Sequence, residues 1–432
     1  MSHSRTIPVF RLHSPQGRAL LKRIASSRGS RNTRVDRIVS RVLAGVAKRG
    51  DAALFSYTRQ FEERALSARS VRVSPAHIRA RAEKASPALK NTIRRAATRI
   101  RAYHARQKKA GFTMRTAEGV LSLRVVPLAR AGVYVPGGYT AYPSSVLMNV
   151  VPAQVAGVKE IAVVTPVTGR LDPAIAFALD LLGITEVYQI GGAQAVAALA
   201  YGTKSVRAVD KIVGPGNAFV AAAKRAVYGT VDIDSIAGPS EVAIIADTSA
   251  KAAWIALDML AQAEHGTGDE TAVCITESMT LARRVAAHLA EQITASPVRG
   301  MLRRLPGHAL SVFVCDSRRE SIELVNVLAP EHLQIMTRKS RDDAKKIHNS
   351  GAIFLGPHTP VALGDYYIGT NHVLPTGGTA RFASGLGVDD FVKRISVAEV
   401  GKKGFRASAK YVSRFARAEG FVHHAMSVEE RG

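Results

Sequence analysis

Short strand-like runs alternate with alanine-rich helical stretches along this 432-residue chain from about residue 131 onward. Strands that alternate with helices predict parallel sheets covered by helices on both faces. The first series of expected strands is 132–135, 160–165, 186–190 and 211–213, with helices at 145–156, 173–182, 193–200 and 218–227. A second series of strands is expected at 241–246, 272–276, 311–315, 333–336 and 352–355. We therefore predict an α/β fold with two doubly wound, Rossmann-like parallel-sheet domains, together with N-terminal helices and a small helical C-terminal tail.

The net charge of +26 is concentrated in the N-terminal third. Residues 1–130 contain 30 Lys and Arg against 6 Asp and Glu, whereas residues 131–432 contain 30 against 28. Ser86 and Pro87 predict the start of a basic amphipathic helix, whose charged face is either ordinary solvated surface or a binding surface for a polyanion. No zinc-finger, KH, RNP or basic-zipper pattern accompanies this charge, so the solvated surface is the favoured interpretation over nucleic-acid binding.

Location and redox chemistry are constrained by what the sequence lacks. No apolar run approaches the roughly 18 residues that a membrane span needs, and residues 1–14 do not form a secretory signal. We therefore expect a cytoplasmic protein with no membrane partner. Cys274 and Cys315 lie far apart in apolar sequence, which predicts two buried thiols rather than a disulfide or a metal site.

One glycine-rich turn is a candidate for binding an anion. Neither GxGxxG nor a P-loop motif follows any expected strand. The segment 214–217 (GPGN) ends an expected strand and begins an expected helix. Its backbone N–H groups could face an anion such as a pyrophosphate, or the segment could be a simple strand-to-helix turn.

Polar side chains at the end of one apolar helix could bind a metal. Asp247 is expected to cap a helix that runs to Gly266. The last turn of this helix carries Gln262 and His265, which lie three residues apart and therefore share a face. An amide oxygen and an imidazole can bind a divalent cation such as Zn²⁺, although a histidine at a helix end also interacts favourably with the helix dipole.

Two later segments carry side chains suited to acid–base chemistry or binding. Glu331 and His332 are adjacent, and a carboxylate beside an imidazole could act as an acid–base pair on one substrate. Asp365 and His372 lie in the Gly- and Pro-rich segment 356–387, which predicts a long loop that carries binding residues.

Taken together, these stretches resemble the histidinol dehydrogenase family. The matching segments are 135–152 (VPGGYTAYPSSVLMNVVP), 191–195 (GGAQA), 214–220 (GPGNAFV), 237–242 (AGPSEV), 262–266 (QAEHG), 329–333 (APEHL) and 364–381 (GDYYIGTNHVLPTGGTAR). The resemblance extends from about residue 30 to the end of the chain. It implies oxidation of L-histidinol to L-histidine through the aldehyde, in the last steps of histidine biosynthesis, with NAD and one Zn²⁺ per subunit.

The resemblance also implies a role for each functional position. The implied zinc ligands are Gln262, His265, Asp365 and His424, and the residues implied to contact NAD are Tyr134, Gln194 and Asn217. His332 resembles the general base for the alcohol, and Glu331 resembles the base that activates water for attack on the aldehyde. The implied substrate-binding residues are Ser240, His372 and Glu419, together with His332 and the zinc ligands. His424 is chosen over His423 because it lies five residues after Glu419, as in the family's tail motif.

The family's tail residues come from the partner subunit, so the resemblance implies a homodimer with shared active sites. The expected division is an arm at 1–30, a first α/β domain from 31–131 with 238–378, a second at 132–237, and a dimerisation tail at 379–432. Two alternatives remain. One is a dehydrogenase on the same scaffold that acts on another amino alcohol or a sulfonated diol, and the other is polyanion binding through the basic N-terminal third.

Overall fold

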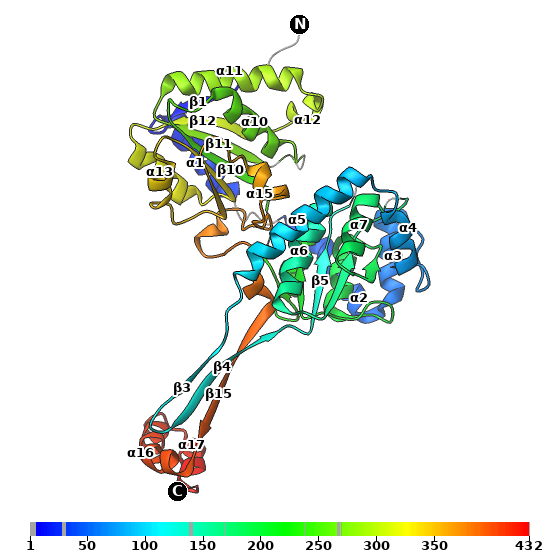
Figure 1. Ribbon diagram of the computed structural model, residues 1–432, viewed down its shortest axis with the longest axis vertical. Coiled ribbons are helices and arrows are strands. Elements are labelled where there is room, and N and C mark those ends of the chain that lie inside the picture. Colours follow the sequence, from blue (N-terminus) through cyan, green and yellow to red (C-terminus); the bar gives the residue numbers. More distant parts are fainter. Residues whose placement is uncertain are drawn as a thin grey trace.

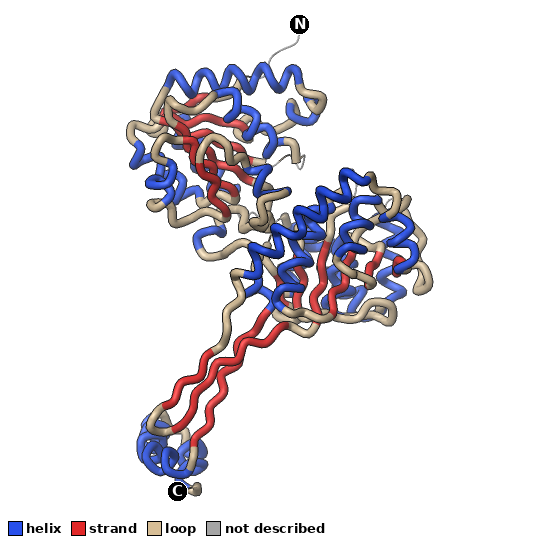
Figure 2. The backbone as a smooth tube through the Cα atoms, viewed as in Figure 1, coloured by secondary structure: helices blue, strands red, loops and turns tan. Residues whose placement is uncertain are grey.

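The computed structural model describes residues 6–27, 32–137, 141–167, 169–236, 238–265, 268 and 270–431. Figure 1 shows two α/β lobes and a long arm that carries the C-terminal helices away from them. Figure 2 shows that each lobe is built on its own sheet and that the arm is mainly strand. The expected α/β class with two parallel-sheet domains and a helical tail is confirmed.

The first sheet is formed mainly by the first strand series. Its order is β2 (Arg72–Val73), β7 (Glu186–Tyr188), β6 (Glu160–Val164), β5 (Arg130–Tyr134), β8 (Lys211–Val213) and β9 (Asp232–Ile233). All neighbouring strands are parallel except β2, which pairs antiparallel with β7. One face packs against α2 (Thr33–Arg49), α3 (Asp51–Glu62), α8 (Gly192–Tyr201) and α9 (Ala218–Val227). The other face packs against α4 (Pro75–Ala82), α5 (Pro87–Ala105), α6 (Pro143–Ala156) and α7 (Pro173–Leu181).

The second sheet is parallel throughout and repeats this order. It runs β1 (Val9–Arg11), β12 (Leu310–Val314), β11 (Thr271–Thr276), β10 (Glu241–Ala246), β13 (His332–Met336) and β14 (Ala352–Leu355). Helices α10 (Ala252–Ala263) and α11 (Met279–Ala295) cover one face, and α1 (Pro15–Ser27) and α13 (Arg318–Leu328) cover the other. Three short helices complete this lobe, namely α12 (Arg299–Leu302), α14 (Ser340–Ala344) and α15 (Val361–Tyr366).

The matching order gives each sheet one topological switch point. The chain builds β5, β6 and β7 outward in one direction and then returns to place β8 and β9 on the other side of β5. It does the same with β10, β11 and β12, followed by β13 and β14. In open α/β sheets, ligands bind beside the carboxyl ends of the strands at such a point. The switch points lie between β5 and β8 in the first sheet and between β10 and β13 in the second.

The arm is an antiparallel sheet that we did not predict from the sequence. It consists of β15 (Val392–Val400), β4 (Gly119–Pro127) and β3 (Phe112–Arg115), with β4 in the middle. Helices α16 (Lys402–Ala418) and α17 (Val422–Glu429) follow β15 at its far end. The expected tail at 379–432 therefore contains a strand before its helices, and a segment within 31–131 pairs with it.

The packing differs from the expected grouping of residues 31–131 with 238–378. Helices α2 to α5 cover the first sheet, so residues 33–105 belong with 130–233. The second sheet instead recruits β1 from the expected N-terminal arm, where Val9 pairs with Val312. The reason is tertiary: α2 to α5 bury their apolar stripes against the first sheet, whereas β1 occupies a free sheet edge.

Several local predictions can be checked directly. The hydroxyl of Ser86 accepts a hydrogen bond from Leu89 N at 3.3 Å, which confirms the predicted cap of α5. Asp247 does not cap α10, because that helix begins after Lys251 and Asp247 instead closes a turn with Ser249. Gly266 lies outside the described residues. Cys274 and Cys315 are free and buried, as predicted.

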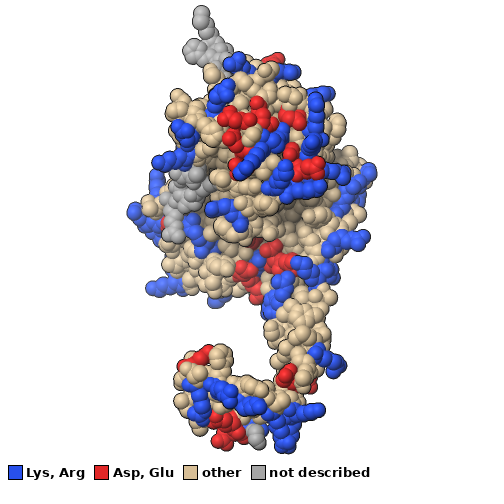
Figure 3. Space-filling model, turned by 90° about the vertical axis from the view of Figure 1, so that its left-hand side faces the viewer, with Lys and Arg blue, Asp and Glu red and all other residues tan. Residues whose placement is uncertain are grey.

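Part of the N-terminal positive charge is used inside the molecule. The Lys90 ammonium and Arg94 guanidinium lie over the Phe177 ring, and the Arg99 guanidinium lies 4.7 Å from the centre of the Tyr367 ring. Cations over aromatic rings stabilise packing by about 0.5–1 kcal/mol at exposed sites. On the face in Figure 3, Lys and Arg are scattered among Asp and Glu rather than gathered into one patch. Among the described helices, none is long and apolar enough to cross a membrane.

Candidate active site

Glu331 and His332 lie at the amino edge of the second sheet, where β13 begins beside β10. Glu331 Oε2 accepts a hydrogen bond from Glu241 N at 2.9 Å. His332 Nδ1 lies 3.1 Å from the Glu241 carbonyl oxygen. Because a carbonyl only accepts, Nδ1 must carry the proton of that hydrogen bond. Nε2 then points toward Asp365, whose Oδ1 is 3.5 Å away.

The two residues influence each other's charge. Burial raises the pKa of Glu331 to about 7, against the lowering effect of the neighbouring imidazole. Burial alone lowers the pKa of His332, but the carboxylates of Glu331 and Asp365 outweigh burial and raise it to about 9. The carboxylates therefore favour a protonated imidazole, and a cation bound beside Asp365 would oppose that preference.

Asp365 is surrounded by imidazoles. It lies in α15, and the expected loop at 356–387 is otherwise largely irregular in structure. Burial raises the pKa of Asp365, but His332, His372 and His265 outweigh it and lower the pKa below the ordinary value. Burial lowers the pKa of His372, so this imidazole is favoured in its neutral form. One carboxylate among three imidazoles is a donor set that suits a borderline cation such as Zn²⁺.

Gln262 and His265 are brought to the same place by the end of α10. Gln262 is buried in the last turn, and His265 follows Glu264, the residue that caps the helix. His265 Nδ1 lies 2.9 Å from the Gln262 carbonyl oxygen and 3.5 Å from the Gln262 amide nitrogen. Ser240 immediately precedes β10, at the same edge of the sheet. The structure thus gathers five of the predicted side chains around Asp365 or beside it: Gln262, His265, Glu331, His332 and His372.

The three residues implied to contact NAD lie at the carboxyl edge of the first sheet. Tyr134 is the last residue of β5, Gln194 lies in the first turn of α8, and Asn217 follows β8. The Tyr134 hydroxyl accepts from Gly192 N at 3.0 Å. A Cβ on Gly214 would lie 2.1 Å from the Tyr134 carbonyl oxygen, so β5 and β8 approach closely where their carboxyl ends meet. This is the switch point of the first sheet, where a dinucleotide fits the topology.

The glycine-rich turn at 214–217 has an internal acceptor for Gly214 N, and anion binding by its remaining amides stays a prediction. Gly214 N donates to Asp234 Oδ2 at 2.7 Å. Asn217 Oδ1 accepts from Phe219 N at 3.1 Å and from Val220 N at 3.2 Å, and so caps α9. The buried Lys224 ammonium bonds Asp234 and the Gly214 carbonyl. The segment is a strand-to-helix turn whose shape a buried ion pair fixes.

The loop around Asp365 joins the two lobes. Asn371 Nδ2 donates to the Met148 carbonyl of α6 at 2.7 Å and lies 3.3 Å from His104 Nε2 of α5. Gly238 N donates to Thr376 Oγ1 at 2.5 Å. Tyr142, which precedes α6, is close enough to raise the pKa of Tyr366 together with burial and nearby carboxylates. These contacts bring the amino edge of the second sheet toward the carboxyl edge of the first.

Glu419 and His424 are not part of this gathering within one chain. Both lie beyond the arm, in α17 or just before it, and both are exposed, as is His423. Figure 1 places these helices far from the two sheets. Among the described residues, one group of three His, Cys, Asp or Glu side chains has ligand atoms within 4.8 Å of one another, and that group is His13, Asp316 and Glu320 on the surface. A single chain therefore supplies only part of the predicted zinc set.

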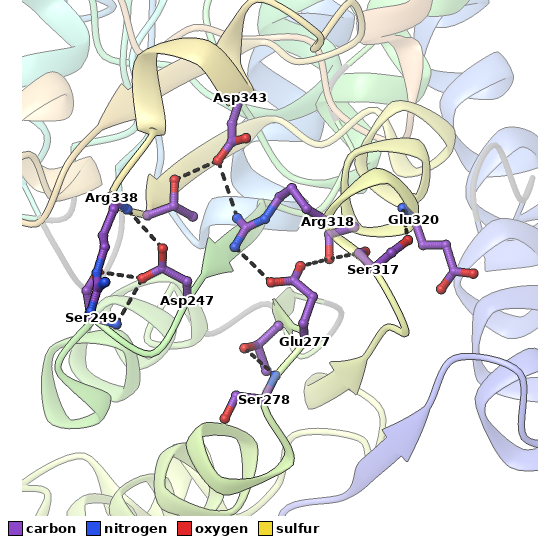
Figure 4. A network of polar contacts seen from close by, with 12 residues as sticks. Asp247, Ser249, Glu277, Ser278, Ser317, Arg318, Glu320, Arg338 and Asp343 are labelled. Carbon is purple, nitrogen blue, oxygen red and sulfur yellow. Dashed lines mark hydrogen bonds and ion pairs between the residues drawn. The ribbon is translucent and has the colours of Figure 1, made fainter.

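The opposite edge of the second sheet carries a polar network that the sequence did not suggest (Figure 4). Arg318 pairs with Glu277 at 2.8 Å and with Asp343 at 3.4 Å. Asp247 Oδ2 accepts from Arg338 N at 2.9 Å across the switch point. Side chains of this chain thus occupy the edge at which open α/β sheets ordinarily bind ligands.

Comparison with known proteins gives a consistent result. A family model described as histidinol dehydrogenase matches residues 25–432. The chain is 45% identical over 400 residues to the histidinol dehydrogenase of Rhodospirillum rubrum, covering 92% of each chain. It is 42% identical over 423 residues to that of Neisseria meningitidis serogroup A, covering 97% of this chain and 98% of the relative. The crystal structure of histidinol dehydrogenase from Elizabethkingia anophelis matches with a TM-score of 0.90 and 34% identity, covering 99% of this chain and 98% of that one.

Proposed function

The chain belongs to the histidinol dehydrogenase family of oxidoreductases, and from this premise we propose that it oxidises L-histidinol to L-histidine through the aldehyde, with NAD and one Zn²⁺ per subunit. The single observation that carries the proposal is the arrangement around Asp365. A buried Glu–His pair on the second sheet shares Asp365 with two further imidazoles, and the Asp365 loop also contacts the cofactor-bearing lobe.

In the first oxidation, His332 takes the proton of the substrate alcohol. The Glu241 carbonyl fixes the proton on Nδ1, so Nε2 of the neutral imidazole has a lone pair for the alcohol proton. Nε2 is buried and has no hydrogen-bond partner of its own among the described residues. NAD supplies the acceptor for the hydride that leaves the same carbon.

In the second oxidation, Glu331 takes a proton from water as the water attacks the aldehyde. A carboxyl with a pKa of about 7 is suited to exchanging protons near neutral pH. The backbone N–H of Glu241 holds Oε2, which fixes the side chain against His332. A second NAD, when bound, would accept the hydride of the hydrated aldehyde, so we expect two NADH from each histidinol.

The predicted zinc ligands fit a metal in their chemistry, because Gln262, His265 and Asp365 combine amide, imidazole and carboxylate donors. Zinc, when bound, would orient the substrate nitrogens and offset the charge of Asp365. We assign the fourth ligand, His424, to the partner subunit, together with the substrate contact Glu419.

A homodimer with shared sites is supported by the surface of the tail. Large apolar side chains are exposed along α16, α17 and the arm, namely Phe112, Met114, Val397, Val400, Tyr411, Val412, Phe415, Phe421, Val422 and Met426. Exposed apolar faces of this kind mark interaction surfaces. A second copy of the chain that covers this face would also bring His424 and Glu419 to an active site that lacks them.

Stoichiometry tests the chemical proposal. NADH formed by purified, zinc-loaded protein from a limiting amount of L-histidinol should reach two per substrate, fall on chelation and return with added zinc. The rival substrate class is tested in the same assay with a sulfonated diol and other amino alcohols. Turnover of one of these without turnover of L-histidinol would contradict the proposed substrate. It would favour a dehydrogenase of the same fold that acts on another alcohol. The cytoplasmic location stays a prediction.

Complementation tests the shared site. His332→Asn and His424→Asn should each abolish most activity when expressed alone. Random pairing of the two variants gives mixed dimers for half of the population, and each mixed dimer has one intact site of two, so about one quarter of wild-type activity should return. Mixtures no more active than the separate variants would show that each chain completes its own site.

A further inference from the structure

The carboxylate of Glu62 comes from a helix and lies at the carboxyl edge of the first sheet, beside the residues assigned to NAD. Glu62 ends α3, and the following Glu63 has a positive φ of 54° that turns the chain away. Glu62 Oε1 accepts from Gly191 N at 2.9 Å and from Gln194 Nε2 at 2.9 Å. Glu62 thus contacts one of the residues assigned to NAD and the backbone at the start of α8.

This placement changes what the start of α8 can bind. The first amides of a helix ordinarily attract a phosphate, because they have no partners within the helix and carry partial positive charge. Here Gly191 N–H already has a carboxylate acceptor, which brings negative charge to the same place. A further anionic group at this end of α8 would meet repulsion rather than attraction.

Glu62 retains the capacity to accept another hydrogen bond. Its Oε2 is buried and has no hydrogen-bond partner among the described residues, and the nearest cation is Arg64, whose Nη1 lies 3.7 Å away. Arg64 directs the same Nη1 to the Gln189 carbonyl at 3.0 Å. An acceptor without a donor at the carboxyl edge of such a sheet suits a hydroxyl group, since a hydroxyl supplies the missing proton.

Sheets that bind dinucleotides use a carboxylate acceptor of this kind to distinguish NAD from NADP. An acidic side chain at the carboxyl edge accepts from the adenosine ribose hydroxyl of NAD, whereas the phosphate that replaces this hydroxyl in NADP is repelled. In this chain β6 ends at Val164 and is followed by Thr165 and Pro166, so no acidic residue stands directly after the second strand of the series. Glu62, the last residue of α3, instead lies beside the carboxyl end of the neighbouring strand, where it accepts from Gly191 N just after β7.

Resting on the proposed function, we propose that Glu62 determines cofactor specificity by selecting a nicotinamide dinucleotide with a free adenosine ribose over one that carries a ribose phosphate. Gln194 supports this selection. Its amide nitrogen donates to Glu62 Oε1 at 2.9 Å, which ties this residue assigned to NAD to the carboxylate.

The test is direct titration of zinc-loaded protein with NAD and with NADP by calorimetry, at mildly alkaline pH. Wild type should bind NAD far more tightly than NADP. Glu62→Gln keeps the size of the side chain and an oxygen acceptor but removes the charge, so the ratio of the two affinities should fall by at least about tenfold, mainly through tighter NADP binding. Arg64→Gln removes the nearest counter-charge and should shift the ratio in the opposite direction.

Asp51→Asn is the matched control. Asp51 begins the same helix and holds Ser205 through its backbone N–H at 3.2 Å and its hydroxyl at 2.7 Å, away from the residues assigned to NAD. Its loss should leave the ratio unchanged. A Glu62→Gln ratio within twofold of wild type, or equal NAD and NADP affinities in wild type, overturns this inference alone. Failure of wild type to bind either dinucleotide overturns it together with the proposed function.

Discussion

The two six-stranded sheets share a strand order but use opposite edges. The first sheet carries the residues assigned to the cofactor at its carboxyl edge, and its amino edge is closed by ion pairs. There Arg130 pairs with Glu160 and Glu186, and Lys211 pairs with Asp232. The second sheet is reversed: its amino edge carries Glu331 and His332, and the Arg318 network fills its carboxyl edge.

This reversal shows that topology alone does not select a binding edge. Both sheets have a switch point at which a ligand could bind. In the second sheet, however, Asp247 already bridges β10 and β13 by accepting from Arg338 N. Side chains that satisfy each other leave no donor or acceptor for a ligand, whereas the buried His332 Nε2 has no hydrogen bond among the described residues, with Asp365 Oδ1 3.5 Å away. We therefore expect the ligand to bind at the edge that has an unsatisfied hydrogen-bonding group.

The difference between the two edges of the second sheet is tested most sharply by the same substitution at each edge. His332→Asn removes the proposed base and should lower kcat by about 10²–10⁴-fold, with zinc content unchanged. His13→Asn makes the same change at the carboxyl edge, where His13 Nε2 lies 3.2 Å from Glu320 Oε1 at the surface. It should leave kcat unaltered in the same steady-state assay. A large loss in both variants would contradict a division between the edges.

At the cofactor edge of the first sheet, Asn217→Asp should affect binding rather than folding. Aspartate caps a helix as well as asparagine, so the hydrogen bonds to Phe219 N and Val220 N should persist. The added charge in the crevice should raise the KM for NAD about tenfold without changing the melting temperature. An unchanged KM would remove Asn217 from the cofactor site.

The polar network at the carboxyl edge of the second sheet should matter only for stability. Arg318→Met leaves Glu277 and Asp343 without their shared cation and should lower the melting temperature by about 3–6 °C, with NAD and histidinol affinities unchanged. Arg319→Met is the control, because that side chain is exposed and its ion pair is with Glu323 in the same helix. A change in substrate affinity for Arg318→Met alone would show that this edge has a role in the reaction.

The smallest effect is expected at the amino edge of the first sheet, and it should depend on pH. Burial raises the pKa of Glu186, but hydrogen bonds from Arg130 and Tyr188 outweigh it and lower the pKa below the ordinary 4.5. The ionised carboxylate therefore stabilises the fold above that pH, and this contribution is lost as the pH falls. Glu186→Gln should lower the melting temperature by a few degrees near pH 7, and the difference should shrink in acid. If the difference in melting temperature between wild type and Glu186→Gln grew in acid, the inferred lowering of the Glu186 pKa would be contradicted.

The strand and helix series were predictable because periodicity and Gly or Pro boundaries are local properties of the sequence. The Glu331–His332 pair, Gln262 with His265, and Asp365 with His372 were named as candidates from their residue types and spacing, the family resemblance supplied their specific roles, and the structure brings them together. Glu62 could not be found this way, because the hydrogen bond that joins it to Gly191 spans 129 residues and follows from the docking of α3 on α8.

Other features were hidden for different physical reasons. Strand β3 is exposed along its whole length within one chain, so it lacks the alternation of buried and exposed residues that signals a strand. Asp247 has the residue type of a helix cap, but its carboxylate is used by Ser249 and Arg338 instead. The grouping of 31–131 was wrong because sequence order does not say which sheet a helix will cover.

The most direct test of the division between the two sheets is the affinity of the His332→Asn variant for NAD, measured by calorimetry with zinc bound. We predict wild-type affinity for NAD in a variant that has lost nearly all turnover, since the residues assigned to NAD lie on the first sheet and the proposed base lies on the second. Loss of NAD affinity in proportion to the loss of turnover would contradict it.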